Sequence, residues 1–147
     1  MPDNDRGVTP SVDTSLASTL ESVDNAEETV LRVAQGVGID EEELHKVGMA
    51  VREAMVNAVV HGNRYNENKK VRLVVSLEPD RLTVRIADQG EGFDMSSLPD
   101  PLAEENLLRQ SGRGILLIRA FVDRFDVRRI EPTGTEVTLI KYLSRGG

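Results

Sequence analysis

Residues 51–63 read VREAMVNAVVHGN, and the rest of the 147-residue chain is best understood from this stretch. It ends a helix predicted over about 41–61, whose apolar residues lie on nearly every side, so much of the helix should be buried. Glu53, Asn57 and His61 nevertheless form one polar line, because residues four apart share a helix face. The line is either a solvent-facing edge of the helix or a functional site. In such a site, a carboxylate next to an amide would suit binding of a hard cation together with acceptance of a proton.

Local signals predict where this helix begins and ends. Asp40 is a good N-cap, and Glu43 follows three residues later, as in a capping box. Gly62 comes directly after His61 and is typical of a left-handed helix stop. A helix with these bounds would be about 30 Å long.

The remaining sequence predicts an α+β fold around this helix. Apolar patterns predict a strand over about 12–19, a helix over 20–37, hairpin strands over 71–77 and 82–86, a helix over 113–122, and strands over 124–130 and 135–143. This order favours a two-layer α/β sandwich, in which helices cover one face of a single mixed, mostly antiparallel sheet.

Two segments lack periodicity. Residues 1–11 are expected to be a disordered N-terminal tail, which leaves 12–147 as one domain. Residues 89–113 contain many Gly, Pro and polar residues, and such a long aperiodic stretch in a compact domain is usually a functional loop or lid.

Composition excludes several classes of function. The chain has 25 acidic and 18 basic side chains, two His and no Cys, so disulfide scaffolds and thiolate metal sites are ruled out, and a His-rich zinc site is improbable. A net charge of -7 argues against nucleic acid as a direct partner. The longest apolar run, 115–118, is far shorter than the ~20 residues of a bilayer span, and no secretory signal is evident. We therefore expect a cytoplasmic domain without a membrane partner.

Three short motifs could carry chemistry. Residues 88–92 (DQGEG) end a strand, where Asp88 could accept a hydrogen bond from an amine such as that of adenine. Residues 111–114 (SGRG) open a helix whose N-terminus could bind phosphate, and residues 133–135 (TGT) join two strands. Taken singly, each motif can also be a plain turn or cap. P-loop, dinucleotide-binding and eukaryotic-type kinase motifs are absent from the sequence.

In this order the motifs resemble those of the Bergerat-fold (GHKL) ATPase superfamily, which includes gyrase-type ATPases and histidine kinases. Residues 53–57 are similar to the N-box, 88–92 to the first glycine box, 112–114 to a second glycine box after an ATP lid, and 134–135 to the final Gly-Thr pair. Within the superfamily, residues 51–63 resemble most the anti-sigma-factor serine/threonine protein kinases of bacterial partner-switching systems.

The resemblance implies roles for individual residues, with ATP and Mg²⁺ as cofactors. Glu53 would be the catalytic base on the serine hydroxyl of a protein substrate, and Asn57 would coordinate Mg²⁺. Asp88 would bind the adenine amino group with a water shared with Thr135. The other nucleotide-binding residues implied are Gly90, Gly92, Gly112, Arg113 and Gly114.

The resemblance also implies partners: a small anti-anti-sigma substrate of the STAS type, a sigma factor that the chain sequesters, and a second copy in a homodimer. The alternative is a non-catalytic module that binds these partners in a nucleotide-dependent way. Intact Glu53 and Asn57 favour the kinase. A detached sensor ATPase domain is a third option, but the residues before the N-box-like motif hold His45 as their single His and predict no phospho-accepting helical hairpin.

Overall fold

The computed structural model describes residues 11–37, 39–90, 114–130 and 133–143. In chain order the elements are β1 (Val12–Ala17), α1 (Leu20–Gln35), α2 (Glu41–Val56), a π-helical segment η2 (Asn57–Gly62), β2 (Lys70–Glu78), β3 (Arg81–Ala87), α4 (Gly114–Phe121), β4 (Arg124–Arg129) and β5 (Thr135–Tyr142). The predicted tail and lid lie almost entirely outside the described residues. Among the described helices, none is long and apolar enough to cross a membrane.

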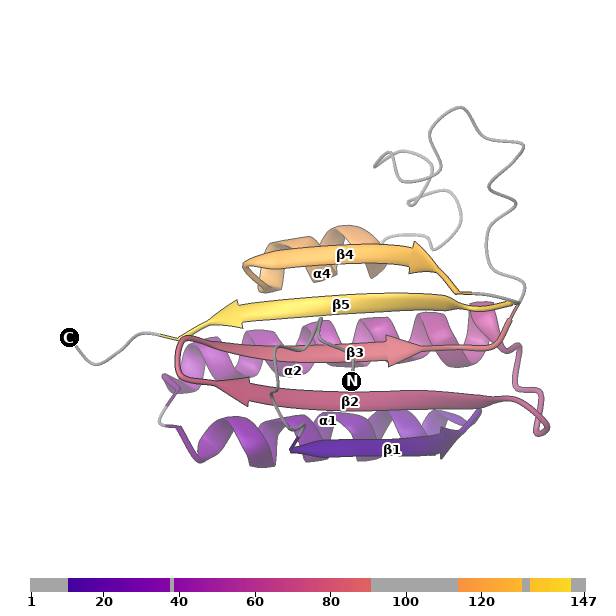
Figure 1. Cartoon of the computed structure of the whole chain (residues 1–147), viewed down its shortest axis with the longest axis horizontal. Coiled ribbons are helices and arrows are strands. Elements are labelled where there is room, and N and C mark those ends of the chain that lie inside the picture. Colours follow the sequence, from indigo (N-terminus) through magenta and orange to yellow (C-terminus); the bar gives the residue numbers. More distant parts are fainter. Residues whose placement is uncertain (1–10, 38, 91–113, 131–132, 144–147) are drawn as a thin grey trace.

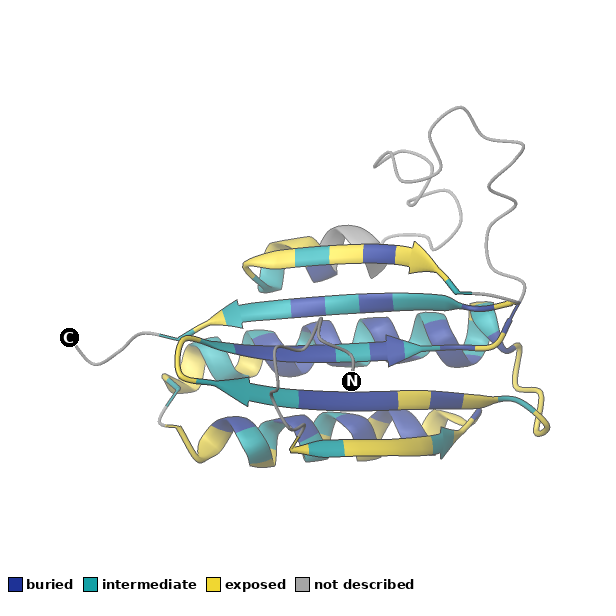
Figure 2. Ribbon diagram, viewed as in Figure 1, coloured by how far each residue is buried: buried dark blue, intermediate teal, exposed yellow. Residues whose placement is uncertain are grey.

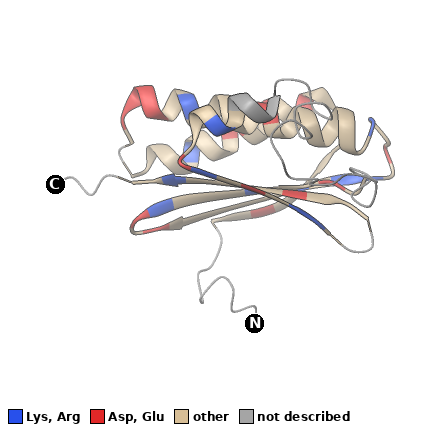
Figure 3. Cartoon of the chain, turned by 90° about the horizontal axis from the view of Figure 1, so that it is seen from above, with Lys and Arg blue, Asp and Glu red and all other residues tan. Residues whose placement is uncertain are grey.

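The five strands form one sheet in the order β1-β2-β3-β5-β4 (Figure 1). The sheet was predicted to be mixed and mostly antiparallel. All four described pairings are antiparallel, so the prediction of a parallel component was wrong. The reason is that β4 forms the outer edge and β5 then turns back between β4 and β3. The helices lie together on one face of this sheet (Figure 3), which confirms the two-layer sandwich.

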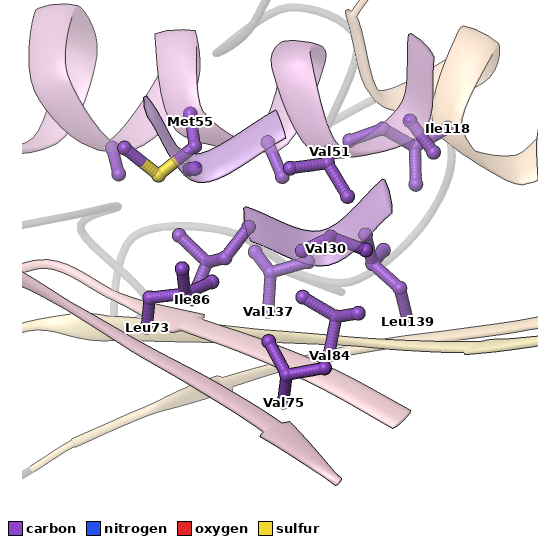
Figure 4. Close-up of a cluster of buried hydrophobic side chains, with 14 of the residues drawn as sticks. Val30, Val51, Met55, Leu73, Val75, Val84, Ile86, Ile118, Val137 and Leu139 are labelled. Carbon is purple, nitrogen blue, oxygen red and sulfur yellow. The ribbon is translucent and has the colours of Figure 1, made fainter. Parts of the chain in front are cut away.

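The core side chains fill the space between the helices and the sheet (Figure 4). Buried residues gather on β2, β3 and α2 (Figure 2). Val51 and Met55 of α2 and Ile118 of α4 are fully buried, and each such side chain contributes about 1.5–3 kcal/mol to folding. Helix α2 contacts α1 on one side and α4 on the other (Figure 1). This central position explains why apolar residues surround α2, as the sequence indicated.

The predicted helix over 41–61 is correct in extent but not in detail. After Val56 the helix widens into the π-helical segment η2, which ends at Gly62. The prediction of a left-handed stop at Gly62 was wrong, because positive φ occurs just beyond it, at Arg64 and Tyr65. The glycine is needed at position 62 for a different reason, a close contact with Asp88.

The predicted capping box at the start of α2 was also wrong. Asp40 is the N-cap residue, but its side chain makes no capping hydrogen bond. The Glu43 carboxylate pairs instead with Lys141 of β5 and, at 3.5 Å, with Lys46. An ionic hydrogen bond to a largely buried Lys141 is stronger than one to a neutral backbone N–H, so tertiary pairing overrides the local motif.

Candidate functional site

The polar line predicted on the central helix runs through the junction of α2 and η2. The carboxylate of Glu53 is half-buried and forms no hydrogen bond or ion pair with the described part of the chain. One turn later, the Nδ2 atom of Asn57 is buried and has no hydrogen-bond partner among the described residues. His61 at the end of the line is exposed. Buried amide groups are normally satisfied, so the Asn57 nitrogen is a donor that an acceptor on a bound ligand or water could satisfy.

The helix widens in the middle of this line, one turn after Glu53. The N–H of Asn63 donates to the carbonyl of Ala58 at 2.8 Å, a bond that spans five residues rather than four. Such π-helical segments are frequent at functional sites, because the extra residue in the turn re-aims side chains. Asn57 is the first residue of this segment.

The end of η2 packs directly against the turn that follows β3, at Asp88 and Gly90. A Cβ atom on Gly62 would lie 2.3 Å from Oδ2 of Asp88, and one on Gly90 would lie 1.9 Å from the carbonyl oxygen of Gly62. Neither approach is possible with a side chain in place. The two glycines therefore let the predicted N-box helix and the predicted first glycine box meet.

Asp88 is a buried carboxylate, 8% exposed, at the centre of this contact. Its Oδ1 accepts hydrogen bonds from the N–H of Gly90 at 3.0 Å and of Thr135 at 3.2 Å. Burial raises the pKa of Asp88 to about 6, against the opposite effect of these two N–H groups and of the nearby Lys69 ammonium. A fixed, desolvated acceptor of this kind is suited to a single amine donor.

The predicted Gly-Thr pair lies on the other side of Asp88. Gly134 has a φ of 136°, a conformation that favours glycine, and a Cβ there would lie 2.4 Å from the Asp88 carbonyl oxygen. The Asp88 N–H donates to the carbonyl of Thr135 at 2.9 Å. Positions that are far apart in the sequence are thus brought to one place, as the motif order predicted.

The phosphate end of the predicted site is described only in part. Gly92, Gly112 and Arg113 lie outside the described residues. Gly114 is the first residue of α4, and α4 packs against α2 (Figure 1).

Sequence reasoning missed one buried polar residue at this site. Asn63 is 2% exposed, and its side chain bonds to three segments: Gln89 beside Asp88, Ser18 before α1, and the start of β2 at Lys70. Its place directly after Gly62 in a polar, turn-rich stretch gave no signal of burial. The contacts that bury it come from residues distant in the sequence.

Comparison with known families tests the resemblance. Residues 16–141 match the histidine kinase-like ATPase domain, which is nearly all of the described chain. The chain belongs to this family.

Relatives of the chain within the histidine kinase-like ATPase family show which branch of the family it resembles. The serine-protein kinase RsbW of Oceanobacillus iheyensis is 31% identical over 130 residues, covering 84% of this chain and 81% of the relative. The anti-sigma F factors of Bacillus thuringiensis and Bacillus anthracis are each 35% identical over 105 residues, covering 70% of this chain and 72% of the relative. The predicted resemblance to anti-sigma-factor serine kinases is confirmed.

Solved structures show the same fold as this ATPase domain. The RsbU and RsbW domains of a Mycobacterium tuberculosis protein match with a TM-score of 0.67 at 18% identity, over 95% of this chain and 34% of that one. The SiaB–SiaC complex of Pseudomonas aeruginosa matches with a TM-score of 0.66 at 11% identity, over 94% of this chain and 93% of that one. The chain thus spans about a third of the Mycobacterium protein, and these likenesses support the fold alone.

Proposed function

We propose that this chain is an ATP-dependent serine protein kinase and anti-sigma factor. It phosphorylates a small anti-anti-sigma partner of the STAS type and sequesters a sigma factor, in the cytoplasm and as a homodimer. Support comes from the family placement and from a single observation in the site. Among the described residues, the buried Nδ2 of Asn57 has no hydrogen-bond partner, and it lies one helical turn from the Glu53 carboxylate, which is also unpaired there. The catalytic domain is proposed to extend over residues 12–147.

Adenine is proposed to bind at Asp88. The carboxylate accepts a hydrogen bond from the base amino group, with a water shared with Thr135. Gly90 and Gly134 keep the backbone on both sides of Asp88 free of side chains. Gly92, Gly112, Arg113 and Gly114 are proposed to complete the nucleotide site.

The residues also fit Mg²⁺ held together with phosphate. An Asn amide offers an oxygen, which is the ligand type that Mg²⁺ prefers, and Mg²⁺ usually takes one or two protein ligands plus substrate phosphates. Among the described residues, no group of three or more His, Cys, Asp or Glu side chains could hold a metal ion without such help. Held by Asn57, the ion would neutralise phosphate charge during transfer.

Glu53 is proposed to act as the general base. Its carboxylate accepts the proton of the partner's serine hydroxyl while the serine oxygen bonds to the γ-phosphorus and the bond from that phosphorus to the β-phosphate bridging oxygen breaks. The products are phosphoserine, ADP and a protonated Glu53, which then returns its proton to water. A positioned base of this kind contributes typically ~10²–10⁴-fold to the rate.

The test uses the full chain to capture partners from its source cell, followed by incubation with ATP and Mg²⁺ and intact-mass measurement of the captured proteins. We expect a small partner to gain the mass of one phosphate, on serine. A partner that stays unphosphorylated while its affinity depends on nucleotide would instead support the non-catalytic module.

A further inference from the structure

Asn63 is a buried polar residue that the proposed mechanism does not use. It is 2% exposed, although His61 before it and Arg64 after it are both exposed. Burying a side-chain amide is costly unless its hydrogen bonds are made inside the protein. The bonds that Asn63 makes therefore indicate what its burial achieves.

The Asn63 amide joins three separate segments. Its Oδ1 accepts from the N–H of Gln89 at 2.7 Å. Its Nδ2 donates to Ser18 Oγ at 2.9 Å and to the Lys70 carbonyl at 3.1 Å. Ser18 Oγ in turn donates to the Lys69 carbonyl at 2.6 Å, so the hydroxyl is held as well. The amide thus ties the segment before α1 and the start of β2 to the chain beside Asp88.

The backbone of the same residue closes the segment that carries Asn57. The Asn63 N–H donates to the Ala58 carbonyl at 2.8 Å, which fixes the last turn of η2. Gln89 stands between Asp88 and Gly90. Among the described residues, the Asn63 oxygen is the single acceptor for the Gln89 N–H. One residue therefore holds both the end of the helix of the proposed metal ligand and the loop of the proposed adenine acceptor.

We propose that Asn63 is a positioning residue for nucleotide recognition, which sets Asp88 at the correct place relative to Asn57 and so favours adenine over other bases. The inference rests on the proposed nucleotide site. Asn63 acts through the Gln89 main chain. Without the Asn63 side chain, the Gln89 N–H loses its acceptor and the Asp88–Gly90 turn loses its anchor to η2.

The expected effect is on binding and base selectivity rather than on transfer. In Asn63→Ala, we expect ATP affinity to fall about tenfold or more, because the Asp88–Gly90 turn is no longer held in place before ATP binds and must be ordered on binding. GTP, which lacks an amino group at the position that Asp88 reads, should bind weakly before and after the change. The ATP-to-GTP preference should therefore shrink, and in the kinase reaction the KM for ATP should rise while kcat changes little.

The experiment is calorimetric titration of the full-length wild type, Asn63→Ala and Val30→Ala with Mg-ATP and Mg-GTP. Val30 is fully buried in α1 and serves as a control for lost stability, measured for each variant by urea unfolding. Reduced ATP affinity and base preference in Asn63→Ala but not in Val30→Ala supports the inference. Equal affinity in all three, or parallel loss in both variants, overturns it.

Two further results separate this inference from the proposed function. If the wild type itself takes up no ATP, the proposed function fails. If Asn63→Ala does not fold, amide hydrogen exchange of the nucleotide-free wild type decides: the Gln89 N–H should be strongly protected, and exchange as fast as in an open loop would overturn the anchoring role.

Discussion

Gly62 lies so close to the carboxylate of Asp88 that a Cβ atom on it would be 2.3 Å from Oδ2 and 2.5 Å from Cγ. This contact joins the helix that carries Glu53 and Asn57 to the turn at the end of β3. Asp88 cannot simply move aside, because its other oxygen is held by the N–H groups of Gly90 and Thr135. The space at position 62 therefore governs the geometry of the whole site.

Gly62→Ala should displace Asp88 and break its hydrogen bonds. Overpacking of this kind costs about 1–3 kcal/mol of folding free energy, and ATP binding should be lost. The matched control is Gly48→Ala in the interior of α2, where a Cβ would meet the end of the flexible Glu27 side chain at 2.9 Å. We expect the control to be neutral or more stable by up to about 1 kcal/mol. Urea unfolding and ATP titration of both variants check this, and equal behaviour would contradict it.

Asp88→Asn should raise stability while it abolishes ATP binding. Burial raises the pKa of Asp88 from 3.8 to about 6, so the folded state binds this proton more tightly than the unfolded state does. The stability from the protonated form is fully present below pH 4 and is lost as the pH rises through 6. At pH 7 the ionised carboxylate lowers the free energy of unfolding by about 3 kcal/mol, because a difference of one unit between the folded and unfolded pKa corresponds to about 1.4 kcal/mol.

The measurement is urea unfolding of wild type and Asp88→Asn at pH 4 and pH 7.5. The variant should gain up to that amount at pH 7.5 and almost nothing at pH 4. ATP affinity of the wild type should fall as the pH drops below 6, since a protonated Asp88 loses its charge. A pH-independent difference between the two proteins would show that burial of the charge is not the cause.

Asn57→Leu should likewise preserve or raise the stability of the nucleotide-free protein while it impairs nucleotide binding. The variant removes a buried nitrogen that has no partner in the described part of the chain. Such a group costs about 1–3 kcal/mol, so the nucleotide-free protein should be at least as stable as wild type. Binding of ATP should lose its dependence on Mg²⁺. Titration of ATP with and without Mg²⁺ tests this, and Mg²⁺-dependent binding retained in Asn57→Leu would exclude Asn57 as the metal ligand.

Lys141→Met should weaken the link between β5 and the start of α2. Lys141 pairs with Glu43 and, at 3.6 Å, with Asp123. The Lys141 ammonium lowers the pKa of Glu43, so this pair stabilises the fold at neutral pH, and its contribution is lost as the pH falls through that lowered pKa. The urea midpoint of Lys141→Met should fall at pH 7 and approach that of wild type near pH 3. Lys46→Met, at the more exposed pair with Glu43, should change little.

The sequence predicted the elements well and their contacts poorly. Hydrophobic periodicity predicted the ends of the helices and strands to within two residues at nearly every end. It could do so because burial on one face of a helix or strand produces a repeating pattern in the local sequence. The capping box at Asp40 and the helix stop at Gly62 failed, since Lys141 and Asp88 act on them from distant parts of the chain. The order of the motifs correctly predicted that Asp88 and Thr135 lie at one site. The burial of Asn63 was not predicted, because its three partner segments meet only in the folded chain.

The most direct test of the central claim compares Glu53→Gln with wild type in single-turnover transfer of phosphate from Mg-ATP to the captured partner, with ATP affinity measured alongside. We expect Glu53→Gln to bind ATP as tightly as wild type and to transfer phosphate ~10²–10⁴-fold more slowly. Transfer at the wild-type rate by Glu53→Gln would contradict the account, as would a wild type that binds no ATP.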